Sequence, residues 1–134
     1  MKRRIYAKKS LGQHYLRDKN IKNKIIKSLD LNQNDTVVEI GCGRGALTDL
    51  IIEKVLKFYG IELDENLFMN LREKYQNENV EMINQDARSV NISELLKNNN
   101  RYKFVGNLPY NQANKIILNF LQNFLSILME KNLI

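Results

Sequence analysis

The sequence predicts an α/β protein in which helices cover a mostly parallel sheet. Short segments at 36–40, 58–61, 80–84 and 102–105 have the composition of strands, with apolar Val80 and Met82 alternating in the third, and helical patterns separate them. A glycine-rich turn follows the first of these strands. Alternation of this kind favours parallel pairing, because neighbouring parallel strands need a long crossover between them.

Each helix has its own signal in the sequence. Asp18 can cap a helix that runs to about residue 29, in which apolar residues recur at helical spacing. The glycine turn leads into a predicted helix at 46–55, and Asp64 can cap another at 65–76. Further helices are expected at 92–97 and 112–123. The apolar tail at 125–129 fits either a fifth strand or more of the last helix, and 98–100 predicts a polar loop.

The composition fits one globular domain. Hydrophobic residues make up 43% of the 134 residues, which is enough for a core. No apolar run reaches the roughly 18 residues of a membrane helix, and the basic amino terminus lacks the apolar stretch of a signal peptide. Cys42 is the only cysteine and His14 the only histidine, which excludes an internal disulfide and a His/Cys metal site.

The net charge of +6 is concentrated at the start of the chain. Residues 1–27 hold ten lysines and arginines against one acid, Asp18, whereas the rest is slightly acidic. Residues 1–17 are expected to form an irregular basic arm, which suits a polyanionic partner such as RNA. A solvated terminus without a partner would have the same composition, so charge alone leaves both interpretations open.

Polar groups and glycines follow the ends of successive strands. Gly41, Gly43 and Gly45 form a turn that allows a ligand to approach the backbone closely. Glu62 ends the second strand and can accept both hydroxyls of a ribose. Asp86 follows the third strand and can accept from an adenine amino group. Together these groups describe a nucleoside-like ligand across the carboxyl edge of the sheet.

Two cofactors fit this edge. The spacing Gly41-x-Gly43-x-x-Ala46 with Glu62 satisfies a dinucleotide fingerprint, and S-adenosylmethionine carries the same adenosine without a pyrophosphate. We favour S-adenosylmethionine, because about 35 residues precede the first strand, whereas dinucleotide folds often begin there. The motif after the fourth strand also has no role in hydride transfer.

That motif is Asn107-Leu108-Pro109-Tyr110, which contains the only proline of the chain. The Asn107 side-chain oxygen and the Leu108 carbonyl can accept hydrogen bonds from an exocyclic amine. Pro109 ends the strand, so the carbonyl before it is expected to face outward. Tyr110 offers a flat face on which a base can stack.

The chain resembles the ribosomal RNA adenine N6-dimethyltransferases of the small-subunit type. Five separated stretches match in family order, which is more specific than any one motif. They are 9–16 (KSLGQHYL), 38–48 (VEIGCGRGALT), 61–64 (IELD), 85–87 (QDA) and 106–111 (GNLPYN). Leu108, rather than isoleucine, resembles the small-subunit branch and not the related branch that modifies large-subunit RNA.

The resemblance implies a Rossmann-like class I S-adenosylmethionine-dependent methyltransferase fold and a role for each matching residue. His14, Leu16, Gly41 and Gly43 would surround the methionine part of the cofactor. Many members have asparagine at the position of His14.

Its implications for the adenosine part and the catalytic corner are equally specific. Glu62 would bind the ribose, Leu63 would pack on the adenine, Asp86 would hold its amino group, and Ala87 would line the ring. Asn107 would lie between the cofactor and the target base, forming the catalytic corner with Leu108, Pro109 and Tyr110. The implied partner is ribosomal RNA of the small subunit, in the cytoplasm.

Full members of the family continue beyond the length of this chain with further strands and a helical RNA-binding domain. Residues 18–134 are therefore expected to be the amino-terminal part of a methyltransferase domain, and the resemblance leaves open whether this part alone transfers methyl groups. An exposed sheet edge would favour self-association. An RNA-binding ribosome assembly factor with a vestigial cofactor pocket is the main alternative. The remaining alternatives are a nicotinamide dehydrogenase, a DNA adenine methyltransferase and a protein glutamine methyltransferase.

Overall fold

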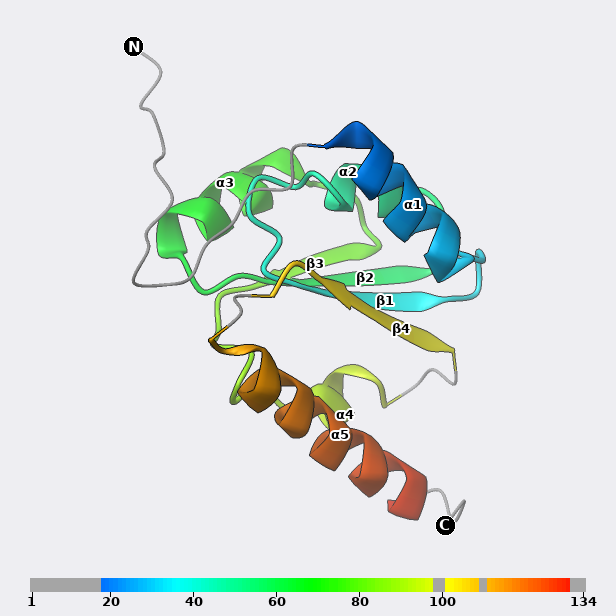
Figure 1. Ribbon diagram of the computed structural model, residues 1–134, viewed down its shortest axis with the longest axis vertical. Helices are drawn as coiled ribbons and strands as arrows, with labels where there is room; N and C mark the ends of the chain where they lie inside the picture. Colours follow the sequence, from blue (N-terminus) through cyan, green and yellow to red (C-terminus); the bar gives the residue numbers. More distant parts are fainter. Residues whose placement is uncertain (1–17, 98–100, 109–110, 131–134) are drawn as a thin grey trace.

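The computed structural model describes residues 18–97, 101–108 and 111–130 (Figure 1). It confirms the predicted α/β architecture, with one parallel sheet of four strands in the order β3-β2-β1-β4. The strands are β1 Thr36–Ile40, β2 Lys57–Ile61, β3 Val80–Ile83 and β4 Tyr102–Gly106. Helices α1, α2 and α3 lie on one face of the sheet, and α4 and α5 lie on the other (Figure 1).

The central strand β1 has all five residues buried, because strands flank it on both edges and helices cover both faces. Successive side chains of a strand point to opposite faces. Val37 accordingly belongs to the apolar cluster beneath α1 to α3, and Val38 to the cluster beneath α4 and α5. The two valines therefore join β1 to both layers of the core.

Both predicted helix caps are confirmed. Helix α1, Lys19–Leu29, begins at Asp18, whose side chain accepts from the backbone N–H groups of Asn20 and Ile21. Helix α3, Glu65–Lys74, begins at Asp64, whose carboxylate accepts from the Leu67 N–H at 3.0 Å. Each cap satisfies donors that have no partner inside the helix. The short helix α4, Ile92–Leu95, is capped by Asn91.

Helix α2, Thr48–Ile51, is much shorter than the predicted 46–55. The glycine turn extends to its start, since Gly45 has a φ of +87°, outside the helical region. After Ile51 the chain leaves the helix, and the N–H groups of Leu56 and Lys57 donate to the Asp35 carbonyl. These bonds draw the chain into β2.

Helix α5, Ala113–Glu130, extends past the predicted 112–123 and includes the apolar tail. The tail is thus helix, and the alternative of a fifth strand at 125–129 is wrong. The predictions for 1–17 and 98–100 lie outside the described residues. Within the described part of the chain, no helix is both long and apolar enough to span a membrane.

A buried carboxylate fixes the amino end of the sheet, opposite the edge that carries the predicted site. Asp35, with a fully buried side chain, pairs with Arg101 at 3.1 Å and Lys103 at 3.0 Å. Burial alone raises the pKa of Asp35, but hydrogen bonds from Lys103, Asn32 and Arg101 together hold it below its usual value. The ion pairs join the start of β1 to β4.

Candidate functional site

The carboxyl ends of the four parallel strands meet at one edge of the sheet, as their register requires. Ile40 pairs with Ile61 on one side and with Gly106 on the other, and Ile61 pairs with Ile83. The residues that follow these positions are the glycine turn, Glu62, the segment leading to Asp86, and Asn107. The structure therefore gathers these predicted site residues at a single edge.

The glycine turn adopts a backbone that side chains rarely tolerate. Gly41, Gly43 and Gly45 have φ values of +71°, +60° and +87°. The Gly41 N–H donates to the Ile61 carbonyl at 2.8 Å, which ties the turn to the end of β2. A Cβ at Gly41 would stand 3.9 Å from the Asn107 carbonyl oxygen, so the turn passes close to the predicted catalytic corner.

A buried tyrosine packs against the glycine turn. Tyr75, at the end of α3, is buried, and its hydroxyl donates to an Asp49 carboxylate oxygen at 2.6 Å. The same hydroxyl lies 3.2 Å from the Gly45 carbonyl oxygen, and a Cβ at Gly45 would collide with it. Burial, and then the hydrogen bond to Asp49, raises the pKa of Tyr75 above its usual value. The hydroxyl thus stays protonated and links α3 to the turn.

Glu62 is held by the backbone on both sides of it. Its carboxylate, in a side chain that is 4% exposed, accepts from the Gly43 N–H at 3.0 Å and the Asp64 N–H at 3.2 Å. Burial raises the pKa of Glu62, and these two hydrogen bonds oppose the rise. Each carboxylate oxygen uses one acceptor position and keeps another for a ligand hydroxyl. Leu63 beside it is 44% exposed and offers an apolar surface at this edge.

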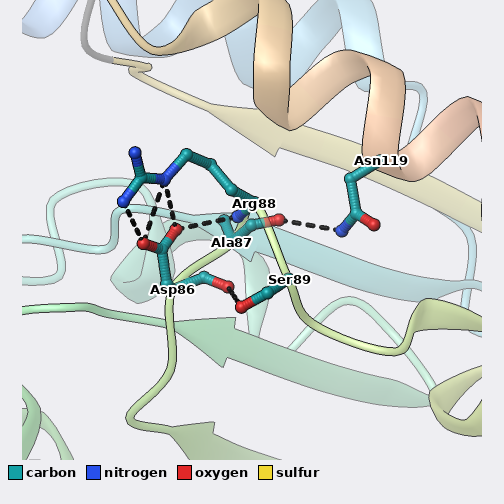
Figure 2. A network of polar contacts seen from close by, with 5 residues as sticks. All are labelled: Asp86, Ala87, Arg88, Ser89 and Asn119. Atoms are coloured by element: carbon teal, nitrogen blue, oxygen red, sulfur yellow. Dashed lines mark hydrogen bonds and ion pairs between the residues drawn. The ribbon is translucent and has the colours of Figure 1, made fainter.

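Asp86 is ionised and paired with a neighbour that the sequence did not single out as its partner. The Arg88 guanidinium Nε lies 3.0 Å from both carboxylate oxygens, and the Arg88 backbone N–H donates to Oδ1 at 2.9 Å (Figure 2). Hydrogen bonding from Arg88 holds the pKa of Asp86 below its usual value. An amino group that binds Asp86 must therefore share the carboxylate with Arg88 or displace it. Ala87 is buried in the core.

Two asparagines that the sequence did not identify as site residues support this edge. Asn84 Nδ2 donates to the carbonyls of Glu62 and Leu63, at 2.9 and 3.2 Å. Asn119 Nδ2, on α5, donates to the carbonyl of Ala87 at 3.0 Å. Asn119 stands three residues after Ile116 and next to Phe120, both buried, and a polar residue at such spacing signals a buried partner.

A buried acid lies beneath the turn. Glu39, on β1, is 2% exposed and accepts from the Thr48 hydroxyl at 2.8 Å. Burial raises the pKa of Glu39 to about 8, with Glu62 and Asp49 adding to the effect and Thr48 opposing it. Cys42 is buried as well, which raises its pKa and makes it a poor nucleophile.

The predicted catalytic corner follows β4. Asn107 is exposed, and Leu108 is partly buried against a groove of about 220 Å³ between β4 and α5. Gly106 before them packs against β1, since a Cβ there would lie 2.7 Å from the Ile40 carbonyl oxygen. Pro109, Tyr110, His14 and Leu16 lie outside the described residues. Among the residues that the structure describes, no cluster of three His, Cys, Asp or Glu side chains could hold a metal ion.

Comparison with known proteins gives consistent matches. The family model for "Ribosomal RNA adenine dimethylase" matches residues 5–133. "Ribosomal RNA small subunit methyltransferase A" of Sulfurihydrogenibium sp. (strain YO3AOP1) is 41% identical over 86% of this chain and 45% of its own length. The protein of the same name from Hydrogenobaculum sp. (strain Y04AAS1) is 42% identical over 87% of this chain and 44% of its own. The chain thus spans less than half the length of these relatives.

Solved structures agree with the fold. A dimethyladenosine transferase from Plasmodium falciparum superposes with a TM-score of 0.67 and 24% identity, over 81% of this chain and 38% of that one. The 23S rRNA methyltransferase ErmE superposes with a TM-score of 0.66 and 27% identity, over 78% and 41%. Both resemble this chain across its sheet and helices.

Proposed function

Since the chain belongs to the ribosomal RNA adenine dimethylase family and has its class I methyltransferase fold, we propose that it acts in methylating adenine N6 in ribosomal RNA, with S-adenosylmethionine as methyl donor. One observation supports this most directly. The glycine turn, Glu62, the loop at 84–91 that contains Asp86 (the Asp86 loop) and Asn107 share the carboxyl edge of the sheet, where α/β folds bind nucleotide-like ligands.

The cofactor edge has groups that fit the adenosine part of S-adenosylmethionine. Glu62 has acceptor positions for ribose hydroxyls, Leu63 exposes an apolar surface for the adenine ring, and Asp86 is ionised for its amino group. Gly41 and Gly43 let the turn pass close to the methionine part, which His14 and Leu16 would cover. When bound, the cofactor supplies an electrophilic methyl group on a positively charged sulfur.

At the catalytic corner we assign acceptor roles to the Asn107 side chain and the Leu108 carbonyl. A target adenine flipped out of its RNA would stack on Tyr110, which returns about 1–3 kcal/mol of the cost of unstacking. Pro109 would fix the backbone so that the Leu108 carbonyl faces the amine. Hydrogen bonds from the amine to Asn107 and Leu108 turn its lone pair out of ring conjugation. Positioning then accounts for most of the acceleration.

The partner that we propose is ribosomal RNA of the small subunit, contacted by the basic residues 1–27, in the cytoplasm. The relatives' further length would supply the rest of the RNA-binding surface, so 18–134 would be the cofactor half of a longer enzyme. Self-association is also proposed, because β4 is an edge strand and α5 exposes apolar side chains. These side chains are Ile117, Leu118, Leu121, Leu125 and Met129. Sedimentation over a range of concentrations tests this.

The test of the function is transfer of labelled methyl groups from S-adenosylmethionine to small-subunit ribosomal RNA or to small subunits. Asn107→Ala should lose the activity. Asn114→Ala, at an exposed position near the start of α5, should keep it. Activity that Asn107→Ala leaves intact would refute the assignment. RNA binding without methyl transfer by the wild-type chain would favour the assembly-factor alternative.

A further inference from the structure

A single side chain on α5 joins that helix to the loop that follows β3. Asn119 Nδ2 donates to the Ala87 carbonyl at 3.0 Å and to the Val90 carbonyl at 3.1 Å. Figure 2 shows the Asn119 amide directed at Ala87, next to the Asp86–Arg88 pair. Both hydrogens of one amide are therefore used to hold two carbonyls of the same loop.

A second amide fixes the orientation of the first. Asn123 Nδ2, one turn further along α5, donates to the Asn119 backbone carbonyl at 2.7 Å and to Asn119 Oδ1 at 3.1 Å. Because Oδ1 accepts from Asn123, the Asn119 amide presents its NH₂ to the loop. The result is a directed chain of amides from α5 to residues 87–90.

At the Asp86 end of the loop, Asp86 itself accepts hydrogen bonds from backbone N–H groups of the loop. There the Asp86 carboxylate accepts the Arg88 N–H, and the Asp86 carbonyl accepts the Ser89 N–H at 3.0 Å. Ala87 and Val90 are 7% and 3% exposed, so their side chains are fixed in the core. The Asn119 amide donates to the backbone carbonyls of Ala87 and Val90. Because Asp86 directly precedes Ala87, the position of Asp86 depends on how this segment is held.

We propose that Asn119 is a positioning residue that sets the Asp86 loop for recognition of a 6-amino purine, and thereby couples the cofactor edge to the helix that follows the catalytic corner. The inference rests on the proposed cofactor site. Without the Asn119 amide, the Ala87 and Val90 carbonyls would lose these hydrogen bonds and the loop would relax. The Asp86 carboxylate would then move away from the amino group. Loss of the Asn119 amide should therefore weaken the binding of ligands that carry this amino group.

The experiment compares two ligands that differ at one group, S-adenosylhomocysteine and its inosine counterpart, in which oxygen replaces the 6-amino group. Isothermal titration gives the affinity of each for the wild type, Asn119→Asp and Asn119→Ala. The first variant keeps the shape of the side chain but has no NH₂ donor. The second removes the amide without adding charge. Asn114→Asp, at an exposed position on the same helix, is the matched control for added charge.

The wild type and Asn114→Asp should prefer the adenosine ligand by about 10-fold or more, the value of a hydrogen bond to a charged group. Both Asn119 variants should lose most of that preference, through weaker binding of the adenosine ligand alone. An unchanged preference in the two variants would overturn the inference while leaving the cofactor site standing. An equal loss of both ligands would also overturn it, since that is a purely structural effect. A wild type that binds neither ligand would refute the proposed cofactor site, and the inference with it.

Discussion

Replacing Glu39 with glutamine should remove a pH dependence of stability that is built into the centre of the sheet. Glu39 lies on β1 with 2% of its surface exposed, and its pKa is raised from 4.5 to about 8, chiefly by burial. In the unfolded chain the same carboxyl ionises near its ordinary value. Between these two pKa values the folded protein therefore holds a proton that the unfolded chain has lost.

The sign of the effect follows from this proton. Because the folded pKa of Glu39 is raised, its contribution to stability is fully present below pH 4.5 and is lost as the pH rises toward 8. The slope approaches about 1.4 kcal/mol per pH unit within this window, so the total loss is on the order of 3–5 kcal/mol. Glutamine cannot ionise, has nearly the same shape, and keeps an oxygen that can accept from Thr48.

Urea unfolding followed by circular dichroism at pH 5, 6, 7 and 8 measures the effect. The wild type should lose stability across this series more steeply than Glu39→Gln, and the difference between the two slopes is the contribution of Glu39. Glu81→Gln, at an exposed position on β3, controls for the loss of one carboxylate. Parallel curves for wild type and Glu39→Gln would show that Glu39 is ionised in the folded protein and would refute this reasoning.

Three further predictions concern other parts of the structure. Asp35→Ala should lower the unfolding free energy by about 3–5 kcal/mol in urea titrations, because it leaves the partly buried Lys103 without its carboxylate; a loss below 1 kcal/mol would contradict this. Tyr75→Phe should cost about 1 kcal/mol of stability and weaken S-adenosylmethionine binding, since the hydroxyl links Asp49 to the glycine turn. Tyr59→Phe is the control for the loss of a tyrosine hydroxyl. Gly106→Ala should reduce methyl transfer by up to about 100-fold with little change in cofactor affinity, because its Cβ pushes the corner away from β1; unchanged transfer rates would refute it.

The sequence predicted the elements whose signals are local. The four strands are short segments rich in apolar residues, and the caps at Asp18 and Asp64 precede their helices directly. The gathering of Gly41, Glu62 and Asn107 at one edge was also predictable, since parallel strands bring their carboxyl ends together. The length of α2 was not, because it is limited by the Gly45 backbone before the helix and by the path of the chain after it, where the Leu56 and Lys57 N–H groups donate to Asp35 at the amino end of β1.

The parts of the site that sequence reasoning missed depend on contacts between distant residues. Glu39 reads as a polar residue in a strand, and only the covering of both sheet faces makes it buried and protonated. Asn119 lies more than 25 positions from the loop that it holds, so no local pattern connects the two. Asp86 and Arg88 are only two positions apart, so their pairing is local. Which Asp86 carboxylate oxygens accept from Arg88 depends on the geometry of the turn.

We propose that the carboxyl edge of this sheet binds S-adenosylmethionine. Isothermal titration of the 134-residue chain with S-adenosylmethionine, with NAD in a parallel titration, tests it most directly. We expect saturable binding of S-adenosylmethionine and none of NAD. A folded chain that binds NAD instead, or binds neither ligand, would contradict it.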